Sequence, residues 1–284
     1  MLIDMHIHPI FYGSICENEE ELAFRGDQFG VWKQGPMSDE ELFAEWDICG
    51  LTKAALLPLD LTTTEGGWIV SNEQVASLCR RHPDRYIGFA SVDPHRADAL
   101  EVLEKAFREQ DLQGLKLHPS KQKFRPDEAC MEPIYALCQQ ENKPIIFHAG
   151  LSWEPNAPTE YCHPCDFEPV LMRYPGLRVC LSHFAWPWVR EMAMLLMKYP
   201  NAYTDTALLY VDSPEEQMTE LFTKDMGPRW FERCFPRQVM FGSNGPRFRA
   251  FKLKRALDQV PMRGYARENL YYRNALRFLS GEEE

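Results

Sequence analysis

Two histidines near the start of the chain are spaced to bind one metal ion. Residues 3–8 read Ile-Asp-Met-His-Ile-His, a pattern typical of a buried strand. Alternate residues of a strand point to opposite faces, so we expect the apolar residues to face a helix layer and Asp4, His6 and His8 to face the interior. A pair of core histidines is the other interpretation, but unligated imidazoles are costly to bury. We therefore interpret His6 and His8 as metal ligands.

Three more histidines stand at the carboxyl ends of short apolar runs. The runs at 114–117, 144–147 and 178–182 are each followed directly by a histidine, which is His118, His148 and His183 in turn. In a parallel barrel the carboxyl ends of all strands meet at one face, where active sites lie. The five histidines are therefore predicted to converge on one mouth.

The elements that must position these residues alternate along the whole chain. Helical patterns follow most of the apolar runs, and one of them begins after the expected N-cap Ser38. Alternation of this kind predicts an α/β fold, and eight repeats favour a single closed (β/α)8 TIM barrel over residues 1–284. The first connection, residues 9–37, is unusually long and is predicted to be a loop insertion or lid near the mouth. The expected strands are 2–7, 53–58, 86–92, 114–117, 144–147, 178–182, 202–204 and 238–241, and the further helices are 71–81, 97–110, 131–141, 189–198 and 248–257.

Composition excludes several classes of protein. The 284 residues carry a formal charge of −11, which argues against a nucleic-acid partner. No apolar run approaches the roughly 20 residues of a membrane span, and no signal peptide is apparent. We expect a cytoplasmic enzyme with a small-molecule substrate, no membrane partner and a homodimeric assembly. The nine cysteines are expected to be reduced, and a structural zinc site at Cys162 and Cys165 would need a second such pair.

An ordered set of motifs resembles the amidohydrolase superfamily, and within it the amidohydrolase-2 group of aminocarboxymuconate-semialdehyde and γ-resorcylate decarboxylases. The resemblance covers nearly the whole chain, including the C-terminal helix at 269–279 with Asn274-Ala275. It implies a (β/α)8 barrel with one divalent ion, usually zinc. The motifs are Asp-Met-His-Ile-His at 4–8, His-Pro-Asp-Arg-Tyr-Ile-Gly-Phe-Ala-Ser-Val-Asp-Pro at 82–94, Gly-Leu-Lys-Leu-His-Pro at 114–119, Ile-Phe-His-Ala-Gly at 146–150, Leu-Ser-His-Phe at 181–184 and Phe-Gly-Ser-Asn-Gly-Pro at 241–246.

The resemblance also implies a role for each site residue. His6, His8 and His148 are implied to be metal ligands, and His183 is implied to polarise water or substrate beside the ion. The fourth ligand of the family is an Asp in a Gly-Ser-Asp motif, which in hydrolases also serves as the base. This chain has Asn244 at that position.

The substitution at Asn244 changes the expected chemistry. An amide offers a carbonyl oxygen to a metal but carries no charge and cannot accept a proton at neutral pH. We therefore expect weak metal occupancy and assign water activation to His183, with Asn244 as a ligand and catalytic residue. Asp205 is an alternative carboxylate or a structural loop residue. Asn244 itself is interpreted as natural variant chemistry, a degenerate metal site or a deliberate inactivating substitution.

Further residues are candidates for substrate binding. Lys116 and His118 share a strand face, and Lys116 could bind a substrate carboxylate or form a buried ion pair with Asp4. Arg247 follows Asn244 and could bind an anionic group or lie on the surface.

Four functions remain open from the sequence. The leading one is a metal-dependent hydrolase of a small molecule. The others are a carboxy-lyase, a metal-independent lactonase and a non-catalytic binding protein on the same barrel. Metal analysis separates the first two from the last two, and release of carbon dioxide separates the lyase from the hydrolase.

Overall fold

Eight parallel strands build the barrel in the part of the chain that the computed structural model describes, residues 1–31, 34–208 and 213–282. They lie in two ladders, β1-β2-β5 and β10-β9-β8-β7-β6. The ladders meet at two parallel bridges, Ile7 with Gly245 and Ala90 with Leu115. The predicted TIM barrel is confirmed. The strands are β1 (Ile3–Ile7), β2 (Lys53–Leu56), β5 (Tyr86–Gly88), β6 (Leu115–Leu117), β7 (Ile145–Phe147), β8 (Val179–Leu181), β9 (Ala202–Asp205) and β10 (Val239–Met240).

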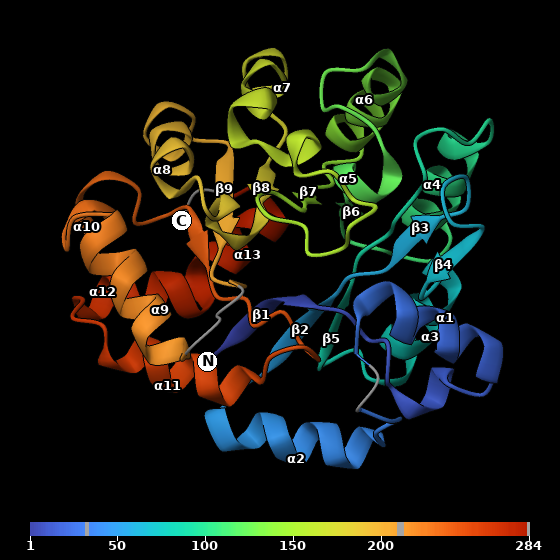
Figure 1. Cartoon of the computed structure of the whole chain (residues 1–284), viewed down its shortest axis with the longest axis horizontal. Coiled ribbons are helices and arrows are strands. Elements are labelled where there is room, and N and C mark those ends of the chain that lie inside the picture. The colour runs from blue at the N-terminus through green and yellow to red at the C-terminus, as the bar shows by residue number, and fades with distance from the viewer. Residues whose placement is uncertain (32–33, 209–212, 283–284) are drawn as a thin grey trace.

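Helices form a ring around these strands (Figure 1). The expected N-cap at Ser38 is confirmed, because its side chain accepts a hydrogen bond from the Glu41 N–H in a capping box. An antiparallel hairpin that the sequence did not suggest, β3 (Leu59–Leu61) with β4 (Gly67–Ile69), follows β2. The helices are α1 (Glu19–Phe29), α2 (Asp39–Cys49), α3 (Asn72–Arg81), α4 (Ala99–Arg108), α5 (Pro119–Gln122), α6 (Glu132–Gln140), α7 (Glu168–Arg173), α8 (Val189–Lys198), α9 (Pro214–Glu220), α10 (Trp230–Cys234), α11 (Ala250–Gln259), α12 (Gly264–Glu268) and α13 (Asn274–Ser280).

The insertion at 9–37 is not a simple loop. It contains α1, whose N-cap Asn18 accepts from two backbone N–H groups and whose C-cap Gly30 has a positive φ of 62°. A left-handed residue of this kind ends a helix at little cost when it is glycine. The insertion therefore contains a helix that is capped at both ends and ends at Phe29.

The predicted orientation of the first strand is wrong for Ile3 and Met5, while Ile7 belongs to the other core cluster, with residues of the helices. Ile3 and Met5 belong to a buried cluster with Ile146, Cys180 and Met240, which come from strands around the barrel. These side chains therefore face the barrel interior and not the helix layer. The pairing of β1 with β2 shifts register between Asp4 and Ile7. An irregularity of this kind breaks the strict alternation of a strand, which explains how histidines beyond it still reach the mouth.

The last helix closes the other end of the barrel. Ala275 and Phe278 of α13 join the interior cluster, and the ring of Phe278 lies 5.0 Å from that of Tyr203 at the start of β9. The polar mouth at the carboxyl ends of the strands thus lies above an apolar core that α13 closes at the opposite end.

Among the described residues no helix is long and apolar enough to cross a membrane.

Candidate metal centre and active site

His6 in β1 and His8 directly after it present unprotonated nitrogens to each other. The His8 Nδ1–H donates to the carbonyl oxygen of Leu57 at 2.9 Å, and the His6 Nδ1–H donates to Oδ2 of Asp205 at 2.8 Å. In a neutral imidazole the other nitrogen then carries a lone pair. These two lone-pair atoms, Nε2 of His6 and Nε2 of His8, lie 3.2 Å apart. Two lone pairs so close repel each other, and a cation bound by both nitrogens would relieve this repulsion.

A second pair of unprotonated nitrogens lies beside the first. The His183 Nδ1–H donates to the carbonyl oxygen of Ala207, and the His148 Nε2–H donates to that of Leu151 at 3.2 Å. The remaining atoms, His183 Nε2 and His148 Nδ1, lie 3.1 Å apart. The rings of His6 and His183, with centroids 4.7 Å apart, join the two pairs. The structure thus arranges four imidazoles in one chain of contacts.

Burial keeps these imidazoles neutral. It lowers the pKa of His8 and of His148 well below the usual value, and that of His183 to about 3. Burial also lowers the pKa of His6, against the opposing effect of the Asp205 carboxylate. Neutral imidazole is the form that ligates metals.

Asp205 is the central acceptor of the site and not a loose loop residue. Its Oδ2 holds His6, and its Oδ1 accepts the backbone N–H groups of His183 at 2.8 Å and of Ala207 at 3.1 Å. Burial favours the neutral acid, but His6 and these hydrogen bonds outweigh it and hold the pKa of Asp205 below its ordinary value. A carboxylate behind a histidine is the usual way to orient a metal ligand. Asp205 therefore orients His6 and His183 from behind.

The backbone after β8 is strained where it presents His183. His183, Phe184 and Ala185 have φ values of 64°, 49° and 48°, in the left-handed region that non-glycine residues rarely adopt. The hydrogen bond from the His183 N–H to Asp205 helps to hold this geometry. Strain of this kind is common at functional sites.

Asn244 follows β10 and faces the same pocket. It is buried, its φ is 63°, and its backbone N–H donates to the carbonyl oxygen of His6 at 2.9 Å. Asn and Asp are the residues that tolerate this left-handed conformation best after glycine. The backbone at this position therefore accepts either the amide found here or the carboxylate of the family.

These donors fit a divalent ion. Nitrogens 3.2 Å apart, as in His6 and His8, subtend roughly 100° at an ion about 2.1 Å from each, which suits a tetrahedral site. His148 and the side chain of Asn244 line the same pocket and would complete the set. His6, His8, His148 and Asn244 therefore stay candidate ligands, and Asp205 stands behind His6; the ligating atoms of His6, His183 and Asp205 also lie within 4.8 Å of one another.

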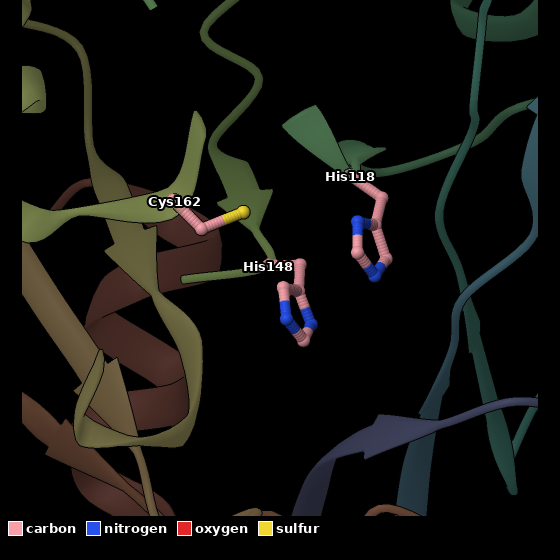
Figure 2. Close-up of side chains that lie close together, drawn as sticks. All are labelled: His118, His148 and Cys162. Atoms are coloured by element: carbon pink, nitrogen blue, oxygen red, sulfur yellow. The ribbon is translucent and has the colours of Figure 1, made fainter. Parts of the chain in front are cut away.

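A second cluster near the mouth is less suited to a metal. Ligating atoms of His118, His148 and Cys162 lie within 4.8 Å of one another. Figure 2 shows the rings of His118 and His148 face to face. Their centroids lie 3.8 Å apart, and their planes are 6° from parallel. In-plane lone pairs of parallel rings cannot meet at one ion. Cys162 instead contacts the Ser120 hydroxyl at 2.9 Å.

The Cys162–Cys165 spacing does not produce a chelate. Cys165 is absent from both clusters of potential ligands among the described residues, and its backbone N–H donates to Nδ1 of His163. The ring of His163 packs on Trp188. All nine cysteines, each within the described ranges, are free thiols.

Lys116 is a buried amine that lacks a partner. Its side chain is 1% exposed, lines the pocket, and has no hydrogen-bond acceptor for Nζ in the described part of the chain. Burial lowers its pKa to about 8. The alternative ion pair with Asp4 is not formed there; Asp4 accepts the backbone N–H groups of His6 and Ser243, and burial raises its pKa to about 7.

The pocket also contains residues that the sequence did not single out. Arg247 lies at its rim as expected, whereas Phe29, Lys121 and Glu154 were missed. Lys121 stands three residues after His118, close to a strand end, so its position was a usable signal. The pocket is lined by His8, Phe29, Leu59, Lys116, His118, Lys121, His148, Leu151, Trp153, Glu154, His183, Asn244 and Arg247.

Comparisons with known proteins agree with this architecture. An uncharacterised TIM-barrel protein from Bordetella bronchiseptica aligns with a TM-score of 0.76 at 20% identity, over 98% of both chains. A 4-oxalomesaconate hydratase from Rhodopseudomonas palustris aligns with a TM-score of 0.67 at 19% identity, over 98% of this chain and 95% of that one. A 5-carboxyvanillate decarboxylase from Novosphingobium aromaticivorans with bound manganese aligns with a TM-score of 0.67 at 17% identity, over 98% and 97%.

At these identities the structural matches establish the fold alone. A search of curated proteins finds no match. The family model for Amidohydrolase, in contrast, matches residues 3–280, which is nearly the whole chain and includes every histidine of the site. The chain therefore belongs to the Amidohydrolase family.

Proposed function

We propose that this protein is a metal-dependent enzyme that hydrolyses a small anionic molecule in the histidine pocket. The observation that carries the proposal is the 3.2 Å approach of Nε2 of His6 to Nε2 of His8, which favours a cation bound by both nitrogens. His148 and Asn244 would complete the ligand set. The chemistry that such an ion supplies is polarisation of a carbonyl group and acidification of water.

His183 is the proposed proton acceptor. Its Nδ1–H is held by the carbonyl oxygen of Ala207, so Nε2 is the atom that can take a proton. A pKa of about 3 keeps Nε2 free at neutral pH but makes it a weak base, so the water must already be acidified. In the proposed reaction water adds to the carbonyl carbon of an ester, lactone or amide, one water proton passes to His183, and His183 returns it to the leaving group.

The positive side chains of the pocket support an anionic substrate. Lys116 lacks a partner for its ammonium group, and Arg247 lies at the rim of the same pocket. A substrate carboxylate would provide the missing acceptor for Lys116. His118, stacked on His148, is the neighbouring group that would pack against the substrate.

Decarboxylation is the second candidate. The similar structures include a decarboxylase and a hydratase, and neither name describes a hydrolase. Asn244 also favours this alternative, because a reaction that deprotonates no water does not need the carboxylate base that Asn244 replaces. In that case a carbon–carbon bond would break, carbon dioxide would leave, and a proton would be delivered to the carbon.

Elemental analysis and activity together test the proposal. Protein purified without added metal should contain a divalent ion, with zinc as the expected identity, and should hydrolyse members of a panel of esters, lactones and amides. Release of carbon dioxide from unsaturated or aromatic carboxylates, without hydrolysis, would establish the lyase instead. Lactone hydrolysis that survives a chelator would indicate a metal-independent lactonase. A protein that binds no metal even when it is supplied, and turns over nothing, would refute both metal-dependent candidates.

A further inference from the structure

Two cations at the rim of the pocket share one carboxylate of the chain itself. Lys121 of α5 and Arg247, in the loop before α11, come from segments far apart in the sequence. The Lys121 Nζ lies 3.3 Å from Oε1 of Glu154, and the Arg247 Nη2 lies 3.8 Å from the same atom. All three side chains line the pocket that contains the histidines. The Glu154 carboxylate therefore occupies an anion position inside the substrate cavity.

The same two cations hold the end of α1 over the site. The Lys121 Nζ donates to the carbonyl oxygen of Gln28 at 2.7 Å, and the Arg247 Nη2 donates to that of Phe29. These are carbonyls of the last turn of α1, which attract cations because they have no partners within the helix. The ring of Phe29 in turn lies 4.6 Å from the ring of His8. The cations thus dock a cover onto the metal-binding end of the pocket.

The contact distances indicate which partner is exchangeable. The bond from Lys121 to Gln28 is short, whereas Glu154 stands 3.3 and 3.8 Å from its two cations, longer than a direct charge-assisted hydrogen bond. Glu154 is also 21% exposed, while Lys121 is 7% exposed. The carboxylate can therefore leave toward solvent without undocking α1.

The charge balance of the pocket points the same way. Three cationic side chains line the pocket, those of Lys116, Lys121 and Arg247. Among the described residues that line it, Glu154 is the one that carries a carboxylate. Lys116 has no acceptor for its Nζ among the described residues. A net positive pocket in a chain of charge −11 selects anions by its local field.

We propose that Glu154 is an internal placeholder, and that a carboxylate of the substrate displaces it to bind between Lys121 and Arg247 beneath the docked end of α1. The substrate class is then a small acid with a carboxylate at one end and the reacting group at the other. The inference rests on the proposed function only in placing the substrate in this same pocket.

Calorimetric titration with glutarate tests the placeholder directly. Glutarate has a carboxylate at each end and serves as the probe, and glutaramide, its uncharged diamide, serves as the matched ligand that should not bind. Glu154→Gln removes the competing charge and is expected to bind glutarate about tenfold more tightly than the unaltered chain, which corresponds to ~1.4 kcal/mol. Lys121→Met is expected to weaken glutarate binding at least about tenfold.

A matched control separates the local effect from a change in net charge. Glu160→Gln alters a carboxylate in the same connection that pairs with Arg125 at 3.0 Å outside the pocket, so its glutarate affinity should equal that of the unaltered chain. An unchanged or weaker affinity in Glu154→Gln would overturn the proposal. Loss of binding in Glu154→Gln with the fold intact would identify Glu154 as a direct ligand of the probe, which also contradicts it.

Metal content makes the two proposals independently testable. Each titration is run on the protein as purified and repeated after dialysis against a chelator. The difference between Glu154→Gln and the unaltered chain should persist after chelation, because Lys121 and Arg247 produce it. A protein without metal would refute the proposed function, but the affinities of Glu154→Gln and the unaltered chain for glutarate could still be compared. A metalloprotein in which both bind glutarate equally would refute only the proposal that Glu154 is displaced by the substrate.

Discussion

The Nδ1 of His6 lies 2.8 Å from Oδ2 of Asp205, although 199 positions separate the two residues in the chain. The contact joins β1 to β9 across the mouth of the barrel and determines which nitrogen of His6 carries its proton. Because the other oxygen of Asp205 holds the backbone N–H of His183, one carboxylate orients both a ligand and the proposed proton acceptor. Asp205 is thus a positioning residue for the whole centre.

Asp205→Asn should weaken metal binding by about 10- to 100-fold. The amide can no longer act as a charged acceptor for His6, so the imidazole loses its fixed orientation and part of its basicity. Competition with a chromogenic chelator measures the dissociation constant. Asp60→Asn is the matched control, since Asp60 is also buried and accepts its backbone hydrogen bonds from Thr62 and Asp93 and not from the histidine segments. Equal metal affinity in the two variants would contradict the positioning role.

Asn244→Asp should raise the metal content of the purified protein. A carboxylate attracts a divalent ion far more strongly than an amide in a site shielded from water, and the left-handed backbone at this position tolerates either residue. Metal analysis of the two proteins, side by side, checks the expectation that the unaltered chain is substoichiometric. Asn18→Asp, at the exposed N-cap of α1, adds the same charge elsewhere and should change nothing. Full occupancy of the unaltered chain would show that the amide suffices.

Lys116 should make the protein more stable as the pH rises from about 8 to 10.5. Its pKa in the folded chain is lowered to about 8 by burial, from an ordinary value of 10.5. Between these values the unfolded chain binds more protons than the folded chain, so the free energy of unfolding increases with pH, by about 3 kcal/mol in total. Denaturant unfolding at a series of pH values measures it. Lys116→Met should remove this rise; a variant with the same pH dependence would exclude Lys116 as its source.

Phe29→Ala should speed the exchange of metal and ligands at the pocket. The Phe29 ring packs against His8 and under the guanidinium of Arg247, so its removal opens the cover without replacing a proposed ligand. The rate at which a chelator removes the ion, followed by stopped flow, is expected to rise several-fold. Phe24→Ala changes an aromatic residue of the same helix that packs near Gly67 and should leave the rate unaltered. Equal rates in the two variants would argue against a covering role.

The arrangement of strands and the position of the candidate ligands at the mouth were predictable because they depend on local patterns. Short apolar runs alternating with helical patterns indicate a barrel, and the carboxyl ends of its strands must share one face. The histidines at 6, 8, 118, 148 and 183 could therefore be assigned to the mouth from their positions in the runs. The departure at Asn244 was visible in the same way, by its place in a family motif.

The partners of those residues depended on tertiary structure. No local pattern shows that Asp205 stands behind His6, that Phe29 packs on His8, or that Glu154 lies between Lys121 and Arg247. The irregularity in β1 also broke the period-two alternation, so the histidines reach the mouth although Ile3 and Met5 face inward. Periodicity reports how a residue sits within its own element, whereas the charge, orientation and cover of this pocket arise from contacts between elements far apart in the chain, which only the closed barrel brings within bonding distance.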